Sequence, residues 1–143
     1  MMTPRTSALL LSAALALIQR PVWADIVVIV SPHNPTVSLT VEQAGDIFLG
    51  RMATFPNGSE AIPIDQNEGT PARVAFYQKS IGKAPPQMKA YWARMIFTGR
   101  GQPPVESGDD AAIKRLVASN PKLIGYIDKS ALDSTVKPVL NLH

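Results

Sequence analysis

The sequence contains no cysteine among its 143 residues. This absence excludes disulfides, thiolate metal sites and a cysteine nucleophile. The two histidines are His33, which lies between prolines, and the terminal His143, and neither has a second ligand at a metal-binding spacing. Ser31, Ser107 and Ser130 have no base in their sequence context, so no set of nucleophile, base and orienting group is recognisable. We therefore expect no metal, no other cofactor and no enzymatic activity.

The sequence also carries little net charge. It has 14 basic and 11 acidic residues, and two of the arginines, Arg5 and Arg20, lie within the first 24 residues. Residues 25–143 therefore hold 12 basic and 11 acidic residues, a net charge of +1. They contain no run of lysines or arginines that would follow a phosphate backbone. Nucleic acid is therefore not an expected partner.

The N-terminal segment has the pattern of a secretory signal peptide. Arg5 precedes an apolar run over residues 7–18, and Val22-Trp23-Ala24 supplies residues that suit a cleavage site. A membrane anchor is the rival interpretation, although the run is short for a span of about 20 residues. We predict a signal peptide over residues 1–24, a mature domain over residues 25–143 and a periplasmic location.

The mature chain alternates short apolar segments with segments of helical periodicity. Asp25 is followed by the β-branched residues 26–30 without alternation, as in a strand buried on both faces. Thr40 and Gln43 form a capping box, and Gly50 suits the end of the helix that they open. The pattern predicts strands over residues 25–30, 61–65, 123–127 and 136–140, and helices over 40–50, 70–80, 87–97 and 107–118. This order predicts one α/β domain with a mixed sheet and flanking helices.

The predicted helix over residues 87–97 is rich in large apolar side chains. Met88, Tyr91, Trp92 and Met95 recur at helical spacing, and Phe97 follows them. Such side chains could stack on a ligand, but this spacing is typical of a helix packed against a core. We expect Tyr91, Trp92 and Phe97 to belong to the core.

Several short segments together resemble a known family. They are Leu39-Thr40, Asp46-Ile47-Phe48-Leu49-Gly50-Arg51, Ile62-Pro63-Ile64, Glu68-Gly69-Thr70, Phe76, Tyr91-Trp92, Phe97-Thr98-Gly99 and Ile124-Gly125-Tyr126. The sequence resembles the second lobe of the substrate-binding proteins of phosphate ABC transporters, and residues 25–141 are similar to short, single-lobe, PstS-like relatives. The resemblance implies the fold of one lobe of a type II periplasmic binding protein.

The resemblance also implies a binding site at the turn that opens the second helix. In the family an arginine and a Ser-Gly-Thr sequence at this turn hold phosphate. Gly69 and Thr70 match that motif, whereas Glu68 replaces the serine and the position of the arginine falls near Ile64. Arg73, one turn into the helix, could supply the missing cation.

The candidate binding residues are Glu68, Gly69, Thr70 and Arg73, together with Ser31 at the end of the first strand. The carboxylate of Glu68 repels an anion, so we expect Glu68→Ser to strengthen anion binding and Arg73→Ala to abolish the gain. An ordinary helix start, with no ligand, remains the alternative interpretation.

Two functions are compatible with these residues. The first is a periplasmic solute-binding module that binds phosphate or another small anion weakly and serves a membrane transporter. The second is a protein-interaction module that kept the fold and lost the ligand, as a partner of a membrane sensor or transporter. Gly69-Thr70 and Arg73 favour the first function, and Glu68 and the missing second lobe favour the second.

Overall fold

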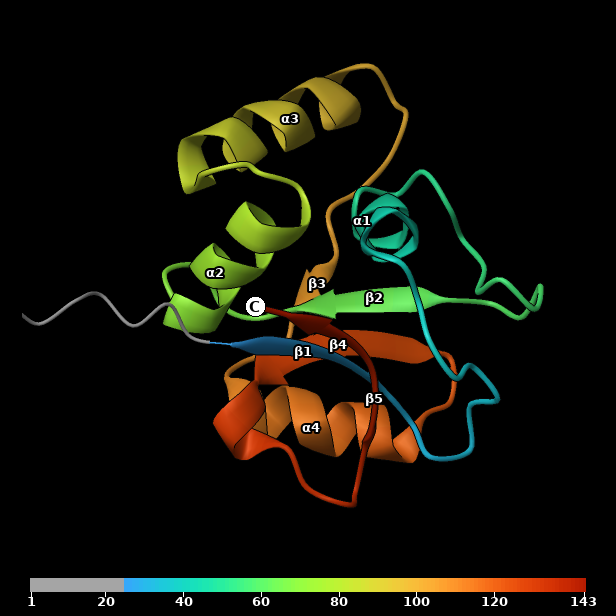
Figure 1. Cartoon of the computed structure of the whole chain (residues 1–143). Coiled ribbons are helices and arrows are strands. Elements are labelled where there is room, and N and C mark those ends of the chain that lie inside the picture. The colour runs from blue at the N-terminus through green and yellow to red at the C-terminus, as the bar shows by residue number, and fades with distance from the viewer. Residues whose placement is uncertain (1–24) are drawn as a thin grey trace, which may run out of the picture.

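A five-stranded mixed sheet forms the centre of the computed structural model, which describes residues 25–143 (Figure 1). The predicted signal peptide lies outside the described residues. The strand order is β3-β2-β4-β1-β5; β1 is antiparallel to β4 and β5, and β2 is parallel to β3 and β4. The strands are β1 (Ile26–Val30), β2 (Ile62–Asp65), β3 (Val105–Glu106), β4 (Leu123–Asp128) and β5 (Lys137–Leu142). The predicted mixed-sheet α/β domain is confirmed.

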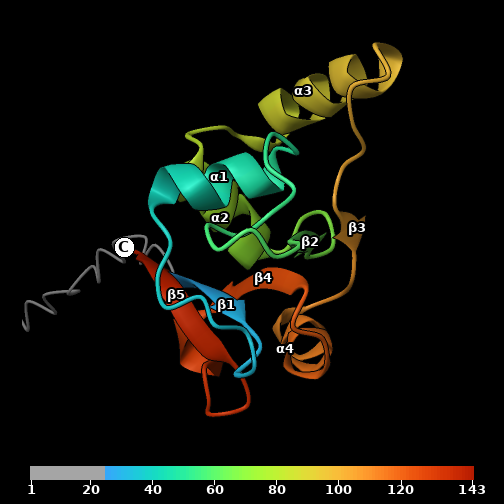
Figure 2. The ribbon, with the colours of Figure 1, turned by 90° about the vertical axis from the view of Figure 1, so that its right-hand side faces the viewer.

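Helices cover both faces of the sheet (Figure 1). They are α1 (Val41–Phe48), α2 (Pro71–Ser80), α3 (Pro85–Phe97) and α4 (Asp110–Ser119), and a short 3-10 helix spans Lys129–Ala131. Helices α1 and α2 lie on one face and α4 lies on the other, while α3 is outermost, beyond α1 and α2 (Figure 1, Figure 2). No helix within residues 25–143 is long and apolar enough to cross a membrane.

Strand β1 is the centre of the core, and all five of its residues are fully buried. Ile26, Val28 and Val30 pack in the cluster shared with α1, α2 and α3, whereas Val27 and Ile29 pack in the cluster shared with α4. Because both faces of β1 are covered, its sequence shows no polar alternation.

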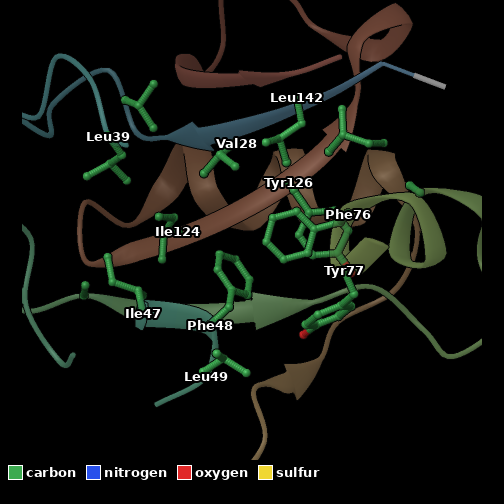
Figure 3. Close-up of a cluster of buried hydrophobic side chains, with 14 of the residues drawn as sticks. Val28, Leu39, Ile47, Phe48, Leu49, Phe76, Tyr77, Ile124, Tyr126 and Leu142 are labelled. Atoms are coloured by element: carbon green, nitrogen blue, oxygen red, sulfur yellow. The ribbon is translucent and has the colours of Figure 1, made fainter. Parts of the chain in front are cut away.

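An aromatic cluster fixes α1 and α2 on the sheet (Figure 3). The rings of Phe76 in α2 and Tyr126 in β4 are stacked, with their centroids 4.1 Å apart and an interplanar angle of 4°. Phe48 of α1 meets Phe76 edge-on at 4.7 Å. Pairs of this kind contribute about 0.5–1.5 kcal/mol beyond the area they bury.

The helix boundaries follow the capping signals with small differences. Thr40 and Gln43 form the predicted capping box, and Asp109 rather than Ser107 caps α4 through a hydrogen bond from the amide of Ala112. Helix α3 begins at Pro85, two residues earlier than predicted, because prolines are tolerated in a first helical turn. The two-residue strand β3 was not predicted.

The outermost helix contradicts one prediction about the core. Tyr91 and Trp92 are buried as predicted, but Phe97 is 92% exposed. Helix α3 contacts the body through Met88, Tyr91 and Trp92. Since a helix turns by about 100° per residue, Phe97 points roughly 140° away from Trp92.

Candidate functional site

The candidate site lies where β2 ends and α2 begins. β2 ends at the buried Asp65, and a turn closed by a 3.2 Å hydrogen bond from the amide of Thr70 to the carbonyl of Asn67 leads into α2. Gly69 in this turn has φ = +86°, a conformation that glycine adopts without steric cost. The glycine of the Gly-Thr sequence therefore suits the turn itself, with or without a ligand.

The start of α2 offers few free amides. The side chain of Thr70 caps the helix by accepting a 3.3 Å hydrogen bond from the amide of Arg73, and Pro71 has no N–H to donate. Among residues 25–143, no acceptor is present for the amides of Gly69 and Ala72. These two amides and the Arg73 side chain are the groups that could donate to a ligand here.

The guanidinium of Arg73 already has two acceptors and two acidic neighbours. Its Nη1 donates to the carbonyl of Gln66 at 2.9 Å and to Oε1 of Glu106 at 2.6 Å, and its Nε lies 3.8 Å from Oδ2 of Asp65. Burial lowers the pKa of Arg73, but the negative charges of Asp65 and Glu106 outweigh that effect and leave it raised. Arg73 is therefore a fixed cation at this site.

Glu106 places a carboxylate at the start of α2. Besides the bond from Arg73, its Oε1 accepts a 3.2 Å hydrogen bond from the amide of Glu68. The Glu106 side chain is 49% exposed, whereas the Arg73 side chain is 23% exposed. Negative charge is favoured at the positive end of a helix. Glu106 thus supplies, from within the chain, a carboxylate beside the start of this helix.

A buried polar network around Asp65 lies beside Arg73. Asp65 accepts hydrogen bonds from the hydroxyls of Tyr77, at 2.6 Å, and Tyr126, and from the amide of Gln66 at 3.0 Å. Burial raises the pKa of Asp65, while the hydrogen bonds from both tyrosines and the charge of Arg73 act in the opposite direction. Burial and the charge of Asp65 also raise the pKa of Tyr77 and Tyr126, so both stay protonated as donors.

The structure brings four of the five predicted site residues together. Gly69, Thr70 and Arg73 form the start of α2, and Glu68 directly precedes them. The carboxylate of Glu68, however, lies 3.9 Å from the amine of Lys89 on α3, and its side chain is 68% exposed. Glu68 therefore does not occupy the helix start with its own side chain.

Ser31 does not join this group, so the prediction that combined it with Gly69 and Arg73 is not supported by the geometry. Ser31 is fully buried after β1, and its hydroxyl accepts a hydrogen bond from the amide of His33. β1 runs antiparallel to β4 while β2 runs parallel to it. β1 and β2 therefore run in opposite directions, and their C-terminal ends lie at opposite ends of the neighbouring strand β4.

Sequence reasoning did not identify the residues that surround Arg73. Glu106 lies on a strand of only two residues, too short for a periodic signal. Asp65 lies at the end of a predicted strand. A carboxylate directly after an apolar run is a signal that could have indicated a functional residue. Tyr77 and Tyr126 read as core residues, which they also are.

Solved structures from several bacteria share this fold. One is a protein from Clostridium perfringens assigned as a phosphate ABC transporter substrate-binding protein, with bound phosphate (26% identity, TM-score 0.63, covering 81% of this chain and 45% of that one). Another is an ABC-type phosphate transport receptor from Vibrio cholerae (18% identity, TM-score 0.64, 82% and 46%). A third is PstS from Borrelia burgdorferi (13% identity, TM-score 0.59, 81% and 47%). No family model and no curated protein sequence matches this chain.

The fold is thus that of one lobe of a substrate-binding protein of a transport system. The resemblance predicted from the sequence is confirmed: the chain is similar to the PstS-like substrate-binding proteins of phosphate ABC transporters. It spans about half the length of the solved structures that it matches, as expected of a single-lobe relative. These neighbours are described as phosphate transport proteins and not as enzymes, in agreement with the prediction that this chain is not an enzyme.

Proposed function

We propose that this protein is a small solute-binding module that binds phosphate or a related small oxyanion weakly at the start of α2. Gly69 and Ala72 provide backbone donors, and Thr70 and Arg73 provide side-chain donors. Helix starts combined with a guanidinium are suited to oxyanions, because the amides and the fork of N–H groups match their geometry.

The observation that carries this proposal is the contact between Glu106 and Arg73. Two donors, Nη1 of Arg73 and the amide of Glu68, already converge on one carboxylate oxygen. A carboxylate and a phosphate accept the same hydrogen bonds, so the geometry suits an oxyanion. The neighbour from Clostridium perfringens, which holds phosphate, supports the same class of ligand.

The same contact is the reason to expect weak binding. A phosphate ion must displace Glu106, which is tethered beside Arg73 and competes at a high effective concentration. Glu106, Asp65 and Glu68 also surround the site with negative charge, which repels an anion. The wild-type Kd for phosphate should therefore be no tighter than about 10 μM.

The proposal includes an exported protein that works beside a membrane transporter. The signal-peptide pattern of residues 1–24 and the transport role of the neighbours support it. The alternative of an interaction module that has lost its ligand is not favoured by these comparisons, and a sensor as partner has no support in them.

Calorimetry on residues 25–143 with phosphate tests the proposal. Glu106→Gln should tighten binding by about tenfold or more, because the amide removes the competing charge, and Arg73→Ala in that background should abolish the gain. Glu60→Gln removes an exposed carboxylate that pairs with Lys122 far from α2 and is the matched control. The proposal fails if Glu106→Gln binds phosphate no better than Glu60→Gln does.

A further inference from the structure

A cavity lies between α2 and α3, the outermost helix (Figure 1). It has a volume of about 330 Å³. One face of each helix forms its walls, because the lining residues recur every three or four positions along the helix. The apolar and aromatic walls consist mainly of Val74 and Tyr77 on α2 and Pro85, Met88, Trp92 and Ile96 on α3.

Contacts with the end of α1 hold α3 in place. The hydroxyl of Tyr91 donates a 2.8 Å hydrogen bond to the carbonyl of Leu49, directly after α1, and Trp92 beside it is buried. In contrast, Val74 and Ile96, which line the cavity, remain 38% and 49% exposed. Helix α3 is therefore anchored, while apolar side chains around the cavity still contact water. A ligand that covers them gains from the burial of apolar surface.

The charged side chains in the lining are already paired within the chain. They are Glu68, Arg73 and Lys89. Nη1 of Arg73 donates to Glu106 at 2.6 Å, and the amine of Lys89 lies 3.9 Å from the carboxylate of Glu68. A charged ligand would have to compete with one of these carboxylates or cations, whereas a neutral molecule leaves both pairs intact.

We propose that this cavity binds a small neutral molecule with an apolar or aromatic body about the size of two fused rings. An apolar cavity of about 150 Å³ holds one benzene molecule, and the cavity between α2 and α3 is about twice as large. The ligand lies between the two helix faces, covers Val74 and Ile96 and contacts the ring of Trp92. This site goes beyond the proposed function and does not depend on phosphate binding at Arg73.

Shape and charge both favour this occupant. A concave site with mainly apolar walls and few polar groups is typical of small-molecule sites, and its volume lies at the lower end of their range. A flat membrane surface would leave such a cavity unfilled. An ionised ligand would lose its hydration without an unpaired counter-charge in the lining, because Arg73, Lys89 and Glu68 already have partners.

The test uses three probes that share one naphthalene ring system: naphthol, which is uncharged at neutral pH, the anion naphthoate and the cation naphthylmethylammonium. Trp92 lines the cavity and is the only tryptophan in residues 25–143, so its indole N–H gives a single signal in nitrogen–proton correlation NMR spectra. Naphthol should shift this signal saturably, with a Kd below about 1 mM. Both ionised probes should bind at least about tenfold more weakly.

Matched variants locate the binding in the cavity. Ala93→Phe adds a ring at an exposed position in the lining and should abolish naphthol binding measured by calorimetry, whereas Ala111→Phe, at an exposed position on α4, should not. Ile96→Asn places a polar group in the apolar wall and should weaken naphthol binding by about threefold or more. Leu116→Asn, at a similarly exposed apolar position on α4, is its control and should have little effect.

Several results would overturn the proposal. It fails if naphthol does not bind, if either ionised probe binds as tightly as naphthol, or if Ala93→Phe and Ala111→Phe bind naphthol equally. A shift of the Trp92 signal with protein concentration alone, which Phe97→Ala abolishes, would assign the surface to a second copy of this chain instead.

Discussion

Glu106 on the edge strand β3 accepts a 2.6 Å hydrogen bond from Arg73 on α2, across a separation of 33 residues in sequence. Arg73 lies between this exposed carboxylate and the buried carboxylate of Asp65. The only acidic group that sequence reasoning considered at this site was Glu68, but its side chain faces Lys89. Under the proposed function, we therefore expect Glu106 rather than Glu68 to limit anion binding.

Glu68→Ser should change phosphate affinity by no more than about threefold, less than the gain expected of Glu106→Gln. The reason is that an exposed carboxylate paired with Lys89 is screened by solvent and salt. Calorimetry on both variants under the same conditions makes the comparison. An equal or larger gain from Glu68→Ser would restore the expectation formed from the sequence.

Trp92→Ala should destabilise the protein by about 3–5 kcal/mol, as truncation of a buried large aromatic does. Trp92 is 8% exposed and meets Tyr91 edge-on at 5.0 Å. Phe97→Ala, at the exposed end of the same helix, should change stability by about 0.5 kcal/mol or less. Urea unfolding followed by circular dichroism measures both variants. Similar losses for the two variants would mean that α3 is packed differently from the structure described here.

Gly125→Ala should cost about 1–3 kcal/mol through overpacking. A Cβ atom at Gly125 would lie 2.6 Å from Cγ2 of Ile113 and 3.3 Å from Cγ2 of Val117, both on α4. The glycine thus lets α4 approach β4 closely.

A double-mutant cycle checks the cause of this loss. Ile113→Ala should be less destabilising in the Gly125→Ala background than in the wild type, because it removes the side chain that clashes. Additive losses would show that the close approach to Ile113 is not what requires a glycine at this position.

The buried carboxylate of Asp65 should make stability depend on pH. Because its pKa in the folded state is raised above 3.8, the stability that it contributes is present below that pH and is lost as the pH rises through its folded-state pKa. Asp65→Asn removes this dependence. The free energy of unfolding of the variant should therefore increase relative to that of the wild type as the pH rises from 3.8 through the folded-state pKa of Asp65.

Asp133 provides a control of opposite sign. The hydrogen bonds from Lys114 and Thr135 lower its pKa from 3.8 to about 2, so its contribution is lost only as the pH falls through that range. Asp133→Asn should therefore alter the pH profile below 3.8 and leave it unchanged above. Denaturant unfolding across the acidic range measures both variants. A wild type whose stability does not fall relative to Asp65→Asn as the pH rises would contradict the raised pKa.

The sequence alone predicted most of the elements, because each has a local cause. The uniform β-branched run of residues 26–30 indicated a strand covered on both faces, and Thr40 with Gln43 indicated the start of α1. Thr70 and Pro71 marked the start of α2, and with Gly69 they located four of the five candidate residues. Capping, turn geometry and periodicity involve residues close in sequence, so a pattern reveals them.

Only the tertiary structure determined which distant residues these side chains contact and which of them are exposed. Strand order placed the two residues of β3 beside β2 and thereby brought Glu106 to Arg73, a contact that no local pattern encodes. Because β1 and β2 run in opposite directions, Ser31 at the end of β1 lies at the opposite end of the strands from the start of α2. The turn of α3 exposed Phe97 while it buried Trp92. Pairings between distant residues depend on how the sheet assembles as a whole, and for that reason the fold could be predicted from the sequence while the partners of Arg73 could not.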